Sequence, residues 1–183
     1  NMSVIAQAGA KGRQLHKFGG SSLADVKCYL RVAGIMADYS QPDDMMVVSA
    51  AGSTTNQLIS WLKLSQTDRL SAHQVQQALR RYQSELISGL LPPEVADGLI
   101  GAFIHDLERL AGLLDSGVND AVYAEVVGHG EVWSARLMSA VLNQQGLESA
   151  WLDARDFLRA ERGAQPQVDE GLSYPLLQQL LAQ

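Results

Sequence analysis

The stretch HKFGGSSLAD, residues 16–25, decides how the start of this sequence is interpreted. It joins a short strand pattern over residues 14–18 to a helix pattern through two consecutive glycines. The apolar residues after the glycines recur at helical spacing: Val26, Leu30, Ala33 and Ala37. Ser22, with Asp25 three residues later, predicts a capping box at the start of this helix. The stretch therefore predicts a strand that feeds a helix through a tight glycine turn.

The same design follows a second time. MMVVSA, residues 45–50, is an apolar run of strand length, and AGSTTN, residues 51–56, leads into a helix with Leu58, Ile59 and Leu62 on one face. Two strand–loop–helix units in succession are typical of a parallel sheet covered by helices. We therefore predict the α/β class.

The rest of the chain is mostly helical in pattern. Two amphipathic helices, around residues 75–86 and 95–110, are separated by Pro92-Pro93 and form a helical insertion between strands. A third helix is expected from about Asn119 to Asn143, interrupted at residues 128–131, with Gly146 as its stop. ESAWLD, residues 148–153, predicts a third strand, and Pro175 marks the start of a last helix.

Composition excludes several classes of protein. The chain has 183 residues with 46% hydrophobic positions, which favours one globular unit. A net charge of -6 argues against nucleic-acid binding. No apolar run is long enough for a membrane span, and Cys28 is the single cysteine. We expect a cytoplasmic protein with no nucleic-acid or membrane partner.

The turn after the first strand carries the residue types of a phosphate site: Lys17, Gly19, Gly20, Ser21 and Ser22. Glycine amides can approach an anion closely, and a lysine ammonium can stabilise charge on a phosphoryl group during its transfer. The alternative is a tight turn beside a solvated lysine, and the spacing alone leaves both readings open. The Walker pattern is absent, so the P-loop class is excluded.

The loop after the second strand is best explained as a binding loop. Ser49 resembles the nucleophile of a hydrolase elbow, but Val47 and Ala51 occupy the positions where that motif requires glycine. Hydroxyls at the carboxyl end of a parallel strand are placed where α/β sheets bind ligands. The alternative is that Thr54 or Thr55 caps the next helix.

The segment GHGE, residues 128–131, places two glycines inside a helix pattern. Gly128 and Gly130 indicate that another group approaches this surface, since glycine costs about 1 kcal/mol in a helix. Glu131 could bind a substrate ammonium, although the residues alone favour a solvated glutamate at a helix junction. His129 is expected to be a packing residue. The other histidines show no metal-ligand spacing: His16, His73 and His105.

Four segments in this order resemble the aspartokinases of the amino-acid kinase family: KFGGSSLAD, VVSAAGSTTNQL, GHGEVWSARLMSAVL and WLDARDFL. Within the family the similarity is greatest to the N-terminal part of the bifunctional aspartokinase/homoserine dehydrogenases of the methionine pathway. The resemblance implies a three-layer α/β/α, carbamate kinase-like fold with a mainly parallel sheet. Residues 14–183 would be the aspartate-binding part of the kinase domain, after an extension over residues 1–13.

The resemblance also implies an activity, in which ATP with Mg²⁺ phosphorylates the side chain of L-aspartate to 4-phospho-L-aspartate. Lys17 would be catalytic and would line the phosphate side with Gly19, Gly20, Ser21 and Ser22. The substrate-binding positions would be Ser49, Thr55 and Glu131. A carboxylate acceptor is ionised at neutral pH and needs no general base, which agrees with the lack of a catalytic triad. A homo-oligomer is expected.

The family's G-R-x-G-S-D segment has no match here, nor does its adenine-binding segment or an NADP-dependent dehydrogenase domain. We therefore expect a truncated polypeptide that binds weakly and does not complete the reaction. Two alternatives stay open: a noncatalytic binding or dimerisation module, and a kinase of the same family acting on glutamate or acetylglutamate. For Asp153 and Arg155 a contact with each other that locks the loop is favoured over ligand binding.

Overall fold

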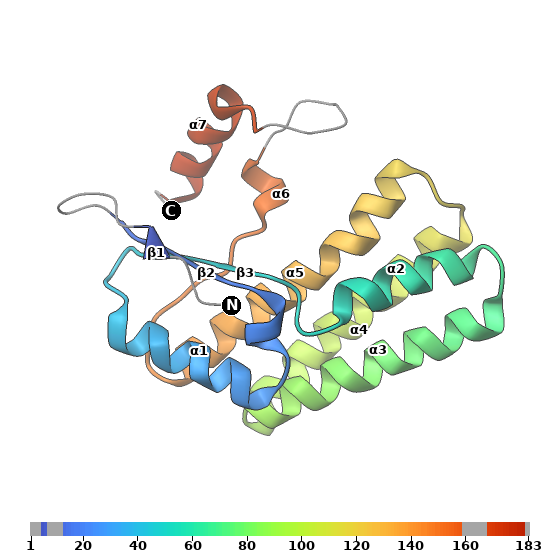
Figure 1. The fold of residues 1–183 in the computed structure, drawn as a ribbon, viewed down its shortest axis with the longest axis horizontal. Helices are drawn as coiled ribbons and strands as arrows, with labels where there is room; N and C mark the ends of the chain where they lie inside the picture. Colours follow the sequence, from blue (N-terminus) through green and yellow to red (C-terminus); the bar gives the residue numbers. More distant parts are fainter. Residues whose placement is uncertain (1–4, 7–12, 159–167, 182–183) are drawn as a thin grey trace. The chain divides into compact units, whose positions relative to one another are not determined.

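The computed structural model describes residues 5–6, 13–158 and 168–181. The chain divides into two compact units, residues 1–149 and residues 150–183, and each is described by itself. The first unit holds the sheet and most of the helices, and the second holds two further helices (Figure 1).

The sheet of the first unit has the order β1-β2-β3. Strand β2 (Leu15–Phe18) pairs in parallel with β3 (Met45–Val48), with Leu15 opposite Met45 and Phe18 opposite Val48. Strand β1 (Ile5–Ala6) pairs with β2 in the antiparallel sense and was not predicted from the sequence. The α/β class and the parallel pair are confirmed.

The connection after β2 differs from the prediction. A short 3₁₀ helix, η1 (Gly20–Leu23), precedes α1 (Val26–Tyr39), and the N-cap of α1 is Asp25. The Asp25 carboxylate accepts the Cys28 amide at 2.8 Å, so the predicted Ser22 capping box is wrong. Ser22 lies inside η1, where its amide donates to the Gly19 carbonyl. The helix α1 therefore begins later, and its N-cap is Asp25, three residues after Ser22.

Four long helices follow the second strand, as predicted: α2 (Thr54–Ser65), α3 (Arg69–Leu90), α4 (Pro93–Asp115) and α5 (Asp120–Gln144). The Pro92-Pro93 break separates α3 from α4, and Gly146, with φ +83°, follows the end of α5. The predicted interruption at residues 128–131 is wrong, because α5 runs through them without a break. In Figure 1 these helices form a bundle beside the sheet and α1.

Two apolar cores hold the first unit together. One lies among the sheet, α1, α5 and the adjoining ends of α3 and α4, and contains Phe18, Tyr29 and Leu137. The other lies among α2, α3, α4 and α5 and contains Trp61, Phe103 and Trp133. Because α5 contributes to both cores, it connects the sheet to the helical insertion.

A buried carboxylate joins β2 to the turn before β3. Asp44 accepts the backbone amides of Gln41 at 2.9 Å and Gln14 at 2.8 Å, and its Oδ2 lies 3.1 Å from His16 Nε2. These two amides, and secondarily His16, hold the pKa of the Asp44 carboxyl below its usual range. His16 therefore has a structural role at the start of the parallel pair.

The expected third strand over residues 148–153 is wrong, because this segment forms neither helix nor strand. The Asn143 side chain occupies both backbone groups of Ser149: its amide donates to the Ser149 carbonyl at 2.9 Å and its oxygen accepts the Ser149 N–H at 2.8 Å. A strand would need those groups for its ladder.

In the second unit, α6 (Ala154–Phe157) and α7 (Glu170–Leu181) are the described helices. Pro175 lies inside α7, so its predicted place at the helix start is wrong. The helix begins earlier because Asp169 accepts the Leu172 amide at 3.1 Å through its side chain and the Ser173 amide through its carbonyl. The Asp153–Arg155 contact is confirmed, with Arg155 donating to Asp153 Oδ2 at 2.6 Å.

Candidate active site at the ends of two parallel strands

The two predicted binding loops leave the same edge of the sheet. Strands β2 and β3 are parallel and in register, and the Ser49 amide donates to the Phe18 carbonyl at 3.0 Å where both strands end. The loop over residues 19–25 and the loop over residues 49–53 therefore begin side by side. We call them the first loop and the second loop. The carboxyl edge of parallel strands is where open α/β sheets bind ligands.

Three separate motifs meet at one residue of the second loop, Ala50. A Cβ added to Gly20 would lie 3.1 Å from the Ala50 carbonyl oxygen, so the first loop packs against the second. A Cβ added to Gly130 of α5 would lie 2.8 Å from the Ala50 Cβ and 3.4 Å from Thr54 Cγ2. The GHGE segment is thus brought to the second loop from a position 80 residues later in the chain.

The expectation that another group approaches the glycines of α5 is confirmed for Gly130. Gly130 is buried and leaves room for the second loop, whereas a Cβ at Gly128 would meet no atom within 4 Å among the described residues. Glu131 follows Gly130 directly and is exposed. The close approach of α5 at Gly130 therefore places the backbone that carries Glu131 near the second loop.

The first loop presents backbone donors and a lysine. The first hydrogen bond of η1 joins the Ser22 amide to the Gly19 carbonyl, so the amides of Gly20 and Ser21 have no acceptor within that helix. Lys17 is exposed on β2, while its neighbours His16 and Phe18 are buried. A Cβ at Gly19 would meet none of the described atoms within 4 Å, so protein packing does not require glycine there.

A threonine side chain holds the second loop in place by a hydrogen bond to the loop backbone, and this bond is not a helix cap. The Thr54 side chain is fully buried and its hydroxyl donates to the Ala51 carbonyl at 2.6 Å. The N-cap of α2 is Ser53, which makes no side-chain capping bond, so the alternative in which Thr54 or Thr55 caps this helix is wrong. Thr55 and Ser49 are both half-buried at this edge.

His129 is a packing residue, as expected. Its Nδ1–H donates to the Glu125 carbonyl at 2.7 Å, so its Nε2 accepts from Arg109 Nη2 at 2.9 Å. Arg109 also pairs with Glu125 at 2.8 Å. The ring is 1% exposed and packs edge-on to Trp133. Both ring nitrogens are thus occupied, Nδ1 by a carbonyl of its own helix α5 and Nε2 by Arg109 of α4.

A second polar cluster lies between α4 and α5 and had no sequence signal. Asp106 Oδ2 accepts from Arg136 at 2.7 Å and from the Trp133 indole at 3.1 Å.

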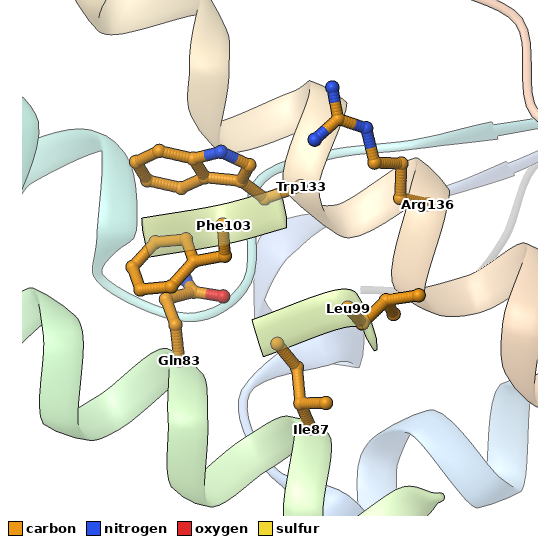
Figure 2. Close-up of a pocket in the computed structure, with 6 residues that line it drawn as sticks. All are labelled: Gln83, Ile87, Leu99, Phe103, Trp133 and Arg136. Carbon is orange, nitrogen blue, oxygen red and sulfur yellow. The ribbon is translucent and has the colours of Figure 1, made fainter. Parts of the chain in front are cut away.

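Trp133 and Arg136 face Gln83 and Phe103 across a small cavity (Figure 2). Its volume is about 10 Å³, which is room for about one water molecule. This cavity is too small for a metabolite.

A larger groove of about 190 Å³ lies among α2, α3 and α4, where Trp61, His73 and Asp115 are among its lining residues. None of the predicted site residues lines it. The candidate site is therefore the loop edge and not either cavity.

Within residues 5–6, 13–158 and 168–181, no three metal-ligating side chains gather and no helix is long and apolar enough to cross a membrane.

Comparison with known proteins gives the family. The model of the amino acid kinase family matches residues 12–183. The chain belongs to the amino acid kinase family. The chain is 90% identical over 182 residues to the bifunctional aspartokinase/homoserine dehydrogenase 2 of Escherichia coli strain K12, and spans 22% of that relative's length. It is 28% identical over 144 residues to the lysine-sensitive aspartokinase 3 of the same organism, covering 78% of this chain and 31% of the relative.

Solved aspartokinases share the fold of this amino acid kinase chain. E. coli aspartokinase III in complex with aspartate and ADP matches with a TM-score of 0.77 at 25% identity, over 90% of this chain and 36% of that one. The same enzyme with lysine and aspartate matches with a TM-score of 0.78 at 24% identity, over 91% and 37%. The amino acid kinase fold and the aspartokinase resemblance predicted from the sequence are confirmed.

The contrast between the two glycines of α5 gives a stability prediction. We expect Gly130→Ala to lower the free energy of unfolding by about 1–3 kcal/mol, because the new methyl overlaps the Ala50 Cβ. Gly128→Ala, the matched control on the same helix, gains about 1 kcal/mol of helix propensity and meets open space. Urea unfolding of both variants checks this, and equal shifts in the two would contradict the packing of α5 on the second loop.

Proposed function

We propose that this chain forms the N-terminal, aspartate-binding part of an aspartate kinase within a longer protein. The observation that carries the proposal is the meeting of three motifs at Ala50, which brings the first loop, the second loop and the Gly130–Glu131 segment to one edge of the sheet. The 90% identity to a bifunctional aspartokinase/homoserine dehydrogenase supports the substrate class.

In the proposed reaction the side-chain carboxylate of L-aspartate attacks the γ-phosphorus of ATP. A bond forms between a carboxylate oxygen and phosphorus, the bond from phosphorus to the β,γ-bridging oxygen breaks, and ADP leaves with the electron pair. The acceptor is already ionised at neutral pH, so no general base is required. The protein's tasks are to position the two substrates and to stabilise charge on the phosphoryl oxygens.

The residues divide into two sides in this proposal. Lys17, the second-last residue of β2, contacts the transferring phosphoryl group. The backbone amides of the first loop, with Gly19, Gly20, Ser21 and Ser22, line the phosphates. No described atom lies where a Gly19 side chain would be, so the backbone there is open to a ligand.

Glu131, Thr55 and Ser49 form the amino-acid side. An exposed carboxylate at Glu131 suits the substrate ammonium, and the half-buried hydroxyls of Thr55 and Ser49 suit its carboxylates. The Mg²⁺ of this scheme is bound with ATP, and we assign no residue of this chain as its ligand. The longer protein would also carry an NADP-dependent homoserine dehydrogenase part and form a homo-oligomer.

The function is tested by trapping the acyl phosphate with hydroxylamine. We expect the longer protein to give the hydroxamate with L-aspartate and ATP-Mg, and to give none with glutamate or N-acetylglutamate. Residues 1–183 alone should give none with any acceptor, because they lack a match to the G-R-x-G-S-D and adenine-binding segments. Phosphorylation of glutamate in preference to aspartate would overturn the substrate, and robust turnover by the 183-residue chain would overturn its assignment as a part.

A further inference from the structure

Two adjacent residues of α3 each reach a different loop of the candidate site. The Tyr82 hydroxyl donates to the Ala24 carbonyl of the first loop at 3.0 Å. The buried Gln83 amide donates at 2.9 Å to the Thr54 hydroxyl, which in turn donates to the Ala51 carbonyl of the second loop. Both contacts come from the helical insertion, far from either loop in the sequence.

The Tyr82 hydroxyl also lies against the second loop. A Cβ at Gly52 would be 2.7 Å from that oxygen and 3.5 Å from the Ala24 Cα and carbonyl oxygen. Gly52 has φ +50°, the left-handed region that favours glycine. The phenol oxygen therefore occupies the space where the two loops come together.

The two donors keep their protons at neutral pH. Burial, and then the negative charge of Asp25, raise the pKa of Tyr82 above its usual value, so the phenol remains a hydrogen-bond donor. The Gln83 side chain carries no ionisable group and is 3% exposed. Neither contact therefore depends on a donor that loses its proton near neutral pH.

We propose that Tyr82 and Gln83 are positioning residues that fix the spacing between the first and second loops. This inference rests on the proposed function, in which the first loop holds phosphate and the second loop the acceptor. Phosphoryl transfer depends on the relative placement of its two partners, and a displacement of about 1 Å can cost roughly 100-fold in rate. A change in the spacing should therefore reduce turnover more than the binding of either substrate.

The test is the Tyr82→Phe variant of the longer protein, which keeps the ring and removes only the hydroxyl. We expect kcat to fall roughly tenfold, with KM for L-aspartate and for ATP within about twofold of wild type. Gln83→Met, which keeps the side-chain length and removes the donor to Thr54, should act in the same direction. The matched control is Tyr29→Phe, which loses a buried 2.7 Å bond to Ser134 between α1 and α5.

Hydrogen–deuterium exchange of the same variants gives a readout that does not depend on activity. Tyr82→Phe should raise exchange in peptides covering residues 19–25 and 49–53, and Tyr29→Phe should not. If Tyr82→Phe matches Tyr29→Phe in both kcat and loop exchange, the positioning role is wrong. If wild type fails to phosphorylate aspartate, the proposed function is wrong, while the exchange result still decides whether Tyr82 joins the loops.

Discussion

Replacing Lys17 with alanine is expected to lower kcat of the longer protein by roughly 100- to 1000-fold, with a much smaller effect on the binding of L-aspartate. Lys17 is exposed near the end of β2, two residues before the glycine loop that we assign to the phosphates. Its ammonium would stabilise charge that builds up on the phosphoryl oxygens only as the transfer proceeds. Loss of such an interaction lowers kcat and kcat/KM together.

The measurement is steady-state kinetics with hydroxamate detection, together with calorimetric titration of L-aspartate. Lys63→Ala is the matched control, because Lys63 is an exposed lysine in the last turn of α2. An unchanged rate in Lys17→Ala would contradict the catalytic role of Lys17. An equal loss in Lys63→Ala would show that the effect is not local to the loop edge.

Replacing Glu131 with glutamine is expected to raise KM for L-aspartate by roughly 10- to 100-fold, which is the range for losing a hydrogen bond to a charged partner. The variant keeps the shape and the helix, and it removes the negative charge that would face the substrate ammonium. Because that ammonium carries the same charge in the ground state and the transition state, kcat should change much less than KM.

Glu108→Gln on α4 is the matched control, since Glu108 is also an exposed glutamate of a long helix. Affinity for ATP, measured separately, should be unchanged in both variants. A KM for aspartate that stays at the wild-type value in Glu131→Gln would remove Glu131 from the amino-acid side of the site.

Much of the fold can be predicted from the sequence because its signals are local. The short strand pattern at residues 14–18 and the apolar run at residues 45–50 predicted β2 and β3, and the period of apolar residues predicted the long helices. The proline pair Pro92-Pro93 also correctly predicted the break between α3 and α4. Three of the failures share a cause, since each depends on a side chain that competes for backbone groups: Asp25 at α1, Asp169 at α7 and Asn143 at Ser149.

The candidate site was predicted less completely than the fold. The loop motifs and the close approach at Gly130 have sequence signals, since glycine is unfavourable inside a helix and favourable beside a loop. Tyr82 and Gln83 have none, because a tyrosine and a glutamine on an amphipathic helix are ordinary residues. Their partners become visible only when α3 is packed, with Tyr82 and Ala24 separated by 58 positions in the chain.

The most direct test of the shared site is a crystal structure of the longer protein with L-aspartate and a non-hydrolysable ATP analogue bound. Our account predicts the aspartate ammonium at hydrogen-bond distance from Glu131, its side-chain carboxylate facing the γ-phosphate, and the Lys17 ammonium on that phosphate. Aspartate bound away from Thr55 and Glu131, or a Lys17 side chain directed away from the phosphates, would contradict it.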